Sequence, residues 1–229
     1  MPHFNIIRET KPEASFRTES VKGQFDLNLN KVVEHFEGNI DIEDKDWQIG
    51  LIVGSSGSGK STIAREIFGA DYVQGFEYDN RSVLDNMPEG LTTEQITKTF
   101  NSVGFATVWS WLKPYHVLSN GEKMRVDLAR AILSRRDTIV FDEFTSVVDR
   151  TVAKTASSAI SKAVRKTGKK FIAVACHFDI IDWLEPDWIY NTDEKRFFFA
   201  QENTNGLRST WKSESVQQKN GSYLRSITI

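Results

Sequence analysis

The sequence has 229 residues, a formal net charge of −2, and 39% hydrophobic and 26% charged residues, which predicts one globular domain with room for a subdomain. The nearly balanced charge excludes a global basic field that would draw the chain to nucleic acid or anionic membranes, and the single Cys176 excludes an internal disulfide framework. The first residues do not have the pattern of a secretion signal, and no apolar run reaches the length of a membrane span. We therefore expect a cytoplasmic protein without an integral membrane segment.

The N-terminal part of the chain predicts little regular structure. Residues 1–20 are polar and mixed, and we interpret them as a loose arm or an edge strand. Residues 21–29 and 39–42 have the patterns of short strands.

A glycine-rich stretch follows the apolar run 47–53, which predicts a buried strand, and it opens a helical stretch over 61–68. It fits the phosphate-binding pattern G-x-x-x-x-G-K-[ST] without a mismatch, and its residues are Gly54, Ser55, Ser56, Gly57, Ser58, Gly59, Lys60 and Ser61, with Thr62 next. Glycines let the backbone approach phosphate closely, and the N–H groups of the loop and the positive end of the helix face the anion. We expect Lys60 to reach the β- and γ-phosphates of ATP and the Ser61 hydroxyl to hold Mg²⁺.

Three aromatic residues precede this loop: Phe16, Phe25 and Phe36. An aromatic ring in this position could stack on adenine, whereas packing in the core is the simpler interpretation for each of them. We take Phe25 as the candidate for the contact with adenine.

The middle of the chain predicts a short strand at 70–73 that ends at Gln74, and then a helix over 92–103. The aromatic-rich segment 109–114 follows, which indicates either the core of a small helical subdomain or a surface that docks a partner. The pentapeptide 118–122, Leu-Ser-Asn-Gly-Glu, leads into a helix over 123–134.

The second half of the chain alternates strands and helices. A strand over 137–141 ends in the acidic pair Asp142 and Glu143, and a helix over 151–167 leads to a buried strand over 170–176 that places His177 at its end. Closing strands are predicted at 187–190 and 195–200, and residues 201–229 form a polar extension. Such alternation predicts a parallel sheet covered on both faces, with ligands at the C-terminal ends of the strands. Gly54, Asp142 and His177 all follow predicted strands, so we expect them to converge on one edge.

These motifs, taken in order, resemble those of the ATP-binding cassette (ABC) ATPases over residues 20–200. The pentapeptide 118–122 discriminates this family from other phosphate-loop families; here Asn120 replaces its central glycine and Glu122 its final glutamine. The resemblance implies an α/β P-loop NTPase with a mainly parallel sheet, an N-terminal antiparallel β portion and a helical subdomain at about 75–135. The ATPase domain would span 1–200, followed by the extension 201–229.

The resemblance also implies site roles at matching positions. Asp142 would support Mg²⁺, and Glu143 would activate the attacking water. His177 would contact the γ-phosphate, and Asp149 would lie at the dimer contact. Ser119 and Gly121 match signature residues that close over the γ-phosphate of ATP on the opposite subunit. Gln74 is the candidate for the glutamine that senses Mg²⁺ and water, although it follows Lys60 unusually soon.

We therefore expect an ATP-hydrolysing, soluble ABC ATPase that forms an ATP-dependent homodimer and acts as a switch on an unidentified macromolecular partner. The alternative is the nucleotide-binding subunit of a membrane ABC transporter whose membrane part is another chain; a small-molecule kinase is disfavoured by the pentapeptide. Residues 178–189 resemble soluble and DNA-repair-type ABC proteins, and residues 111–116 resemble small ABC ATPases of bacteria and phages, some joined to acetyltransferase domains. The basic run 162–170 indicates a solvated helix face or, alternatively, a nucleic-acid contact.

Overall fold

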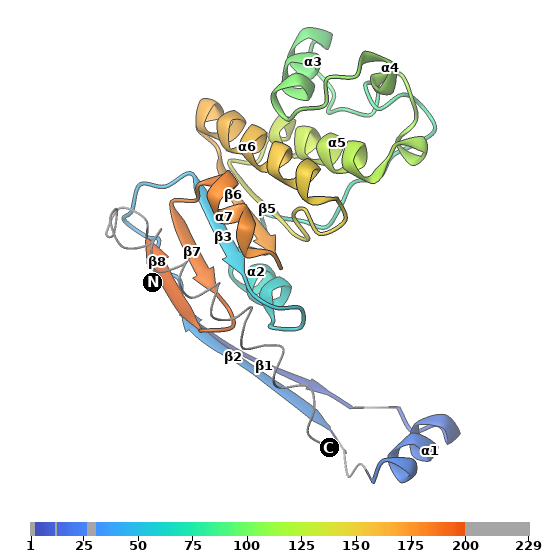
Figure 1. Cartoon of the computed structure of the whole chain (residues 1–229), viewed down its shortest axis with the longest axis vertical. Coiled ribbons are helices and arrows are strands. Elements are labelled where there is room, and N and C mark those ends of the chain that lie inside the picture. Colours follow the sequence, from blue (N-terminus) through green and yellow to red (C-terminus); the bar gives the residue numbers. More distant parts are fainter. Residues whose placement is uncertain (1–2, 12, 27–30, 200–229) are drawn as a thin grey trace.

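The computed structural model describes residues 3–11, 13–26 and 31–199. Within these residues the chain forms a six-stranded sheet, a two-stranded ribbon and helices that cover the sheet (Figure 1). The extension predicted at 201–229 lies outside the described residues. Among the described helices, none combines the length and the apolar character that a membrane crossing requires.

The six-stranded sheet has the order β4-β5-β6-β3-β7-β8. Its strands are β3 (Ile49–Val53), β4 (Tyr72–Val73), β5 (Thr138–Phe141), β6 (Lys170–Ala175), β7 (Trp188–Asn191) and β8 (Arg196–Phe199). All neighbouring pairs are parallel except β7 and β8. The mainly parallel sheet expected from the sequence is therefore confirmed, with the strands within two residues of the predicted ranges.

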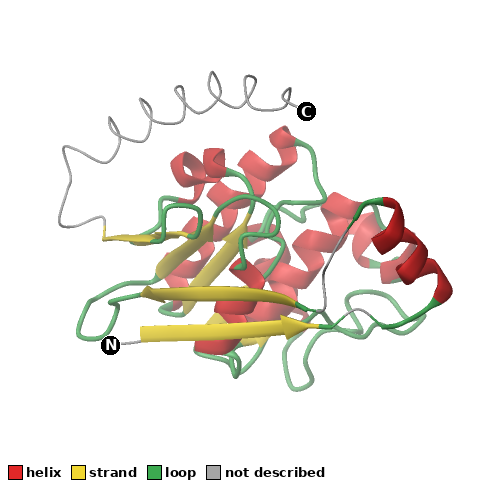
Figure 2. Cartoon of the chain, turned by 90° about the horizontal axis from the view of Figure 1, so that it is seen from below, coloured by secondary structure: helices red, strands yellow, loops and turns green. Residues whose placement is uncertain are grey.

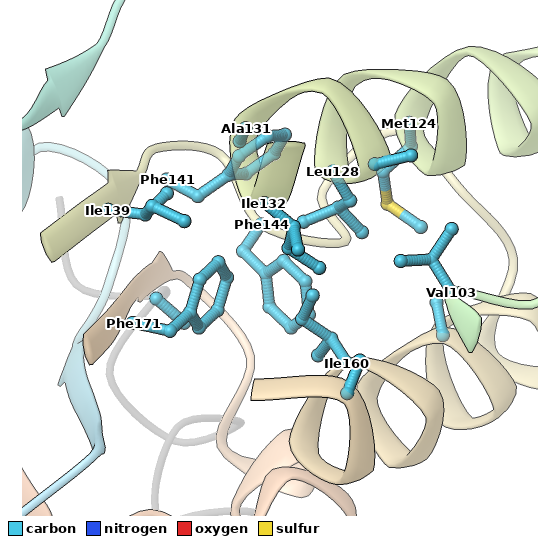
Figure 3. Packing of buried hydrophobic residues seen from close by; sticks show 14 of the residues in the cluster. Val103, Met124, Leu128, Ala131, Ile132, Ile139, Phe141, Phe144, Ile160 and Phe171 are labelled. Atoms are coloured by element: carbon cyan, nitrogen blue, oxygen red, sulfur yellow. The ribbon is translucent and has the colours of Figure 1, made fainter. Parts of the chain in front are cut away.

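Both faces of this sheet are buried by helices. Successive side chains of each strand point to opposite sides, so each strand contributes to two cores. On one face, Leu51 and Val53 of β3 belong to a core with α5 (Asn120–Leu133) and α6 (Arg150–Thr167). Figure 3 shows this core, in which Phe144 and Phe171 pack among side chains of α5 and α6. On the other face, Ile52 packs with the buried side of α2 (Lys60–Phe68). Figure 2 shows the resulting layers from a second direction.

The helical part of the molecule lies between β4 and β5 in the chain. It contains α3 (Thr93–Ser102), α4 (Val108–Trp111), the 3-10 helix η1 (Tyr115–Val117) and α5, coloured green in Figure 1. The aromatic segment is divided between two environments. Trp111 donates a hydrogen bond to the carbonyl oxygen of Phe105 at 2.8 Å and packs on the core, whereas Trp109 is 78% exposed.

The N-terminal ribbon consists of β1 (His3–Thr10) and β2 (Val32–Asn39), which pair antiparallel. This confirms the N-terminal antiparallel portion, but the ranges predicted within it were wrong. Residues 21–24 belong to a helix, α1 (Phe16–Gln24), and Asn39 ends a strand instead of beginning one. The reason is local, because Ser15 and Thr18 form a reciprocal cap that starts α1. The base of the ribbon is held to the sheet by Phe4, whose ring meets that of Tyr190 edge to face.

The short helices η2 (Phe178–Ile180) and α7 (Ile181–Leu184) complete the fold between β6 and β7. They pack against α6 and place the segment after His177 on the side of the sheet that carries α6.

Candidate active site

The phosphate-loop motif connects β3 to α2. Gly57 and Gly59 have φ angles of 82° and 86°, in the left-handed region that glycine adopts at little cost. Lys60 is the first residue of α2, and its ammonium group donates a hydrogen bond to the carbonyl oxygen of Ser55 at 2.5 Å. The lysine thus folds back over the loop at the N-terminus of α2, where backbone N–H groups and the helix dipole favour an anion.

The aromatic side chain that reaches this loop is Phe36. A Cβ atom added at Gly59 would collide with the Phe36 ring, so the ring lies directly against the loop. Phe25, our candidate for the contact with adenine, is the C-cap residue of α1 and is 64% exposed. Because α1 lies at the far end of the ribbon from α2 (Figure 1), the structure does not bring Phe25 to the loop.

Asp142 follows β5, and its carboxylate is oriented by two donors. The backbone N–H of Glu143 donates to Oδ1 at 2.9 Å, and the hydroxyl of Tyr72 on β4 donates to Oδ2. Burial, together with the bond to Asp142, raises the pKa of Tyr72, so the phenol keeps the proton that it donates. Arg65 of α2 lies over the Tyr72 ring, 4.8 Å from its centroid.

Glu143 is exposed and occupies a turn beyond the end of β5. Its φ angle is 52°, and Thr145 in the same turn has a φ of 65° and is fully buried. Left-handed angles in a glutamate and a β-branched residue cost free energy and persist only where the surrounding structure holds them. The backbone N–H of Phe144 supplies such a hold, because it donates to the carbonyl oxygen of Val174 on β6 at 2.9 Å.

The remaining predicted strand-end residues lie at the same edge of the sheet. Gln74 follows β4 and His177 comes two residues after β6; both side chains are exposed. Strands β4, β5, β6 and β3 are consecutive neighbours and all run parallel, so their C-terminal ends share one edge. The structure thus places Gln74, the acidic pair and His177 in a row that ends at the phosphate loop.

The donor set at this edge fits Mg²⁺. This ion prefers oxygen ligands and usually combines one or two carboxylates with water and substrate phosphates. Ser61 in the first turn of α2 supplies a hydroxyl, and Asp142 supplies an already oriented carboxylate. Among the described residues, no group of three or more His, Cys, Asp or Glu side chains could hold a metal ion. The Thr62 hydroxyl instead accepts a hydrogen bond from Arg8 of β1 at 2.8 Å.

The pentapeptide 118–122 forms the N-terminus of α5. Ser119 is the exposed N-cap residue, and its hydroxyl and the Glu122 side chain form a reciprocal capping box. Ser110 also donates to Glu122 at 2.6 Å, and this bond is the main cause that holds the pKa of Glu122 below its ordinary value. Gly121 faces α6, because a Cβ atom there would lie 3.2 Å from Val152.

Ser119 and the phosphate loop lie on different sides of the molecule. The apolar side of α5 belongs to the core on one face of the sheet, and that of α2 to the core on the other. The described residues of one chain therefore do not bring the N-terminus of α5 over its own phosphate loop.

Comparison with known proteins agrees with this geometry, although no family model matches. The chain is 29% identical over 163 residues to the sn-glycerol-3-phosphate import ATP-binding protein UgpC of Ralstonia nicotianae, with 54% of this chain and 44% of the relative covered. It is 32% identical to an uncharacterized ABC transporter ATP-binding protein of Haemophilus influenzae, with 54% and 61% covered. A dimeric post-hydrolysis state of the ATP-binding cassette MJ0796 bound to ADP and Pi has a TM-score of 0.57 at 16% identity, over 76% of this chain and 93% of that one. In sequence the chain is similar to ABC transporter ATP-binding proteins, and it has the fold of ABC ATPase cassettes.

The chain spans about half the length of the curated relatives that it matches. The similarity nevertheless agrees with the fold class that the sequence predicted, a P-loop NTPase with a mainly parallel sheet.

Several residues around this candidate site were not singled out from the sequence. Tyr72 orients Asp142, and Arg150 forms an ion pair with Asp179 that ties the start of α6 to η2, next to His177. Thr192 and Asp193 follow β7 at the same sheet edge and contact the phosphate loop. The strand-end rule that identified Asp142 and His177 would have found Thr192 and Asp193 as well.

The basic run 162–170 is largely engaged within the ABC ATPase fold. Arg165 pairs with Asp187 at 3.0 Å, Lys169 donates to the carbonyl oxygens of Ser134 and Arg136, and Lys170 lies over the Trp47 ring. These internal contacts favour a structural role for the run over a nucleic-acid contact.

Proposed function

We propose that this chain binds ATP with Mg²⁺ and hydrolyses it to ADP and phosphate. The observation that carries the proposal is the row of strand ends, in which the phosphate loop, His177, the acidic pair and Gln74 follow four neighbouring parallel strands. ABC ATPases are the family to which the relatives belong, and one structural neighbour holds the products ADP and Pi.

Each residue has a distinct task in this proposal. The loop N–H groups and Lys60 bind the phosphates, and Ser61 and Asp142 hold Mg²⁺, which neutralises phosphate charge when bound. Glu143 orients the attacking water and accepts its proton, and His177 contacts the γ-phosphate. Gln74, at the end of the row, addresses the metal and the water. Phe36 replaces Phe25 as the aromatic neighbour of the nucleotide.

The decisive experiment is Lys60→Ala, measured by calorimetric titration with ATP and Mg²⁺. We expect tight binding to be lost while the fold is retained, because Lys60 is the cation that the motif supplies to the phosphates. The matched control is Lys98→Ala, since Lys98 is an exposed lysine on α3, outside the site. An unchanged dissociation constant in Lys60→Ala would contradict the assignment of this loop.

We further propose that two copies form the complete site. The α5 N-terminus and the phosphate loop of one chain lie on different faces of its sheet, so Ser119 and Gly121 can cover a γ-phosphate only on a second copy. The helix dipole at Ser119 would favour the negative charge of that phosphate. Asp149, which caps α6, lies beside the dimer contact in this arrangement. The dimeric state of the MJ0796 cassette supports this proposal.

For the biological role, the relatives support the transporter alternative better than a stand-alone switch. The names of the matched proteins describe import or transporter ATP-binding proteins. We therefore propose that the chain is the nucleotide-binding subunit of a membrane transporter, on the cytoplasmic side, with the membrane part in another chain. The exposed apolar side chains of α4 and its neighbourhood, Val108, Trp109, Leu112 and Val117, are available for a partner to cover.

Purification of the native complex tests this role. Cells are fractionated, membranes are solubilised in mild detergent, and the tagged chain is recovered with its partners. We expect an integral membrane protein to co-purify, and Trp109→Ala to weaken its recovery without loss of ATP binding. Recovery from the soluble fraction alone, with a soluble partner or nucleic acid, would support the stand-alone switch instead.

A further inference from the structure

The turn after β7 lies against the first residues of the phosphate loop. Strands β3 and β7 pair in parallel up to Val53 and Asn191, and the backbone N–H of Thr192 donates to the carbonyl oxygen of Val53 at 2.9 Å. The chain after β7 therefore runs beside Gly54, where the loop begins.

Thr192 occupies the space that a side chain at position 54 would need. It is 7% exposed, and a Cβ atom at Gly54 would collide with its hydroxyl oxygen. The same hydroxyl forms a hydrogen bond of 2.6 Å with the hydroxyl of Ser58, in the second half of the loop. Thr192 thus contacts the loop at two points that are four residues apart.

Asp193 holds the loop at Ser55. Its carboxylate accepts hydrogen bonds from the Ser55 backbone N–H at 2.8 Å and from the Ser55 hydroxyl at 2.7 Å. Asp193 is itself fixed, because its N–H donates to the side chain of Asn191 at 3.0 Å, and Asn191 is only 2% exposed. Asn191, a buried strand residue, therefore holds Asp193, and the Asp193 carboxylate holds the loop.

We propose that Thr192 and Asp193 are positioning residues that hold the phosphate loop in its binding conformation before nucleotide arrives. The inference rests on the proposed function, because it concerns ATP binding at the same loop. A loop that contains three glycines loses much conformational entropy when it closes around phosphate. Bonds that order the loop in advance remove part of this cost from binding.

Charge acts in the opposite direction at Asp193. A carboxylate near the phosphates repels them, so the loss of its charge alone would tighten ATP binding. Asp193→Asn and Asp193→Ala separate the two effects. Asparagine removes the charge but keeps an oxygen that can accept the Ser55 N–H, whereas alanine removes both.

The experiment measures binding of Mg²⁺ with the non-hydrolysable analogue AMP-PNP by calorimetry, and thermal melting without nucleotide. Asp193→Ala should raise the dissociation constant by about 10-fold, the value expected for loss of a charge-assisted hydrogen bond. Asp193→Asn should restore most of the affinity. Thr192→Ala should also weaken binding, and Thr192→Ser, which keeps the hydroxyl, should weaken it less.

Asp187 is the matched control, because its carboxylate also accepts backbone hydrogen bonds, at the other end of β3. Its carboxylate accepts hydrogen bonds from the backbone N–H groups of Gln48 and Ile49 at 2.8 and 2.9 Å, and it also pairs with Arg165. Asp187→Ala should lower the melting temperature at least as much as Asp193→Ala while the dissociation constant stays at the parental value.

The outcomes are distinct. Failure of the parent to bind the analogue contradicts the proposed function itself. A parent that binds, with Asp193→Ala and Asp193→Asn both as tight as the parent or tighter, overturns the positioning role. If Asp193→Ala does not fold, the Thr192→Ala and Thr192→Ser pair decides, and equal affinity of the two overturns the proposal.

Discussion

At the residue scale, the turn after β5 combines chemistry with backbone strain. Glu143 and Thr145 both have left-handed φ angles, and the Thr145 hydroxyl, fully buried, has no hydrogen-bond partner among the described residues. β5 ends at Phe141, so both members of the acidic pair lie in the turn beyond the strand, where Glu143 has a left-handed backbone.

Replacement of Glu143 by glutamine tests its role as the base. Glu143→Gln keeps the size of the side chain but loses the basicity, so hydrolysis should fall by a factor of roughly 10²–10⁴ while ATP binding persists. Asp142→Asn should instead lose Mg²⁺-dependent binding as well as turnover. Single-turnover hydrolysis and equilibrium binding are measured for both variants. Hydrolysis at close to the parental rate in Glu143→Gln would show that another group accepts the proton.

The two aromatic candidates give a second prediction at this scale. Phe36→Ala should weaken ATP binding, because the ring lies against Gly59 and truncation opens the end of the loop. Loss of one aromatic contact is expected to raise the dissociation constant by about 3- to 10-fold. Phe25→Ala is the comparison, and calorimetry of both variants decides. A larger effect of Phe25→Ala would restore the interpretation made from the sequence.

At the element scale, α5 carries two carboxyl groups whose pKa values move in opposite directions. The bond from Ser110 lowers the pKa of Glu122, whereas burial raises that of Asp127. Asp127 accepts hydrogen bonds from Tyr78 and Tyr115, both at 2.7 Å, and the rings of these tyrosines stack at 3.9 Å. Hydrogen bonds thereby connect α5, whose N-cap is Ser119, to the segment that follows Gln74.

These shifts predict opposite dependences of stability on pH. The lowered pKa of Glu122 contributes stability that is present above its ordinary value of 4.5 and is lost as pH falls through the folded-state pKa. Glu122→Gln should therefore be less stable than the parent at neutral pH by about 0.5 kcal/mol, because solvent screens this partly exposed carboxylate, and the difference should narrow in acid. The measurement is urea unfolding over a pH series.

Asp127→Asn is the counterpart in the same series. The raised pKa of Asp127 means that folding favours its protonated form. The parent therefore loses stability relative to the variant as pH rises from the ordinary value of 3.8 through the folded-state pKa. A pH-independent difference in the free energy of unfolding is expected as well, because one amide oxygen replaces the two carboxylate oxygens that accept hydrogen bonds from the tyrosines. Parallel pH profiles for parent and variant would contradict the assigned shift.

At the scale of the whole molecule, the proposed site is complete only when two copies meet. The ATP-loaded Glu143→Gln variant, in which hydrolysis is blocked, should dimerise. The double variant Glu143→Gln with Ser119→Arg should remain monomeric. The reason is steric, because the arginine side chain would fill the space over the γ-phosphate. Light scattering with and without ATP is the measurement.

Ser119→Ala is the control for that experiment. It removes the N-cap hydroxyl of α5, at a cost of about 1 kcal/mol, without adding bulk. We expect Ser119→Ala to dimerise and Ser119→Arg to fail. Equal dimerisation of the two variants would argue against a site shared between subunits.

Much of the architecture could be predicted from the sequence, because it depends on local patterns. The run Ile49–Val53, the glycine loop and the helix after Lys60 are adjacent in the chain, and their periodicity and composition determine their structure. The strand-end positions of Asp142 and His177 follow from the same logic. The prediction was wrong for the N-terminal ranges, because the Ser15–Thr18 cap starts a helix that overrides a weak strand pattern in residues 21–24.

Only the tertiary structure decided which residues surround the site. Phe36 reaches Gly59 because β1 and β2 pair and fold back onto α2, whereas Phe25 is carried away on α1. Asp193 lies 138 residues from Ser55 in the chain and meets it because β7 pairs with β3 in a fixed register. By itself the sequence determined the resemblance to ABC ATPases, the phosphate-loop motif and the strand ends, since these are encoded in short contiguous segments. The contacts that position them join distant segments, and strand order and register, which no local pattern encodes, bring those segments together.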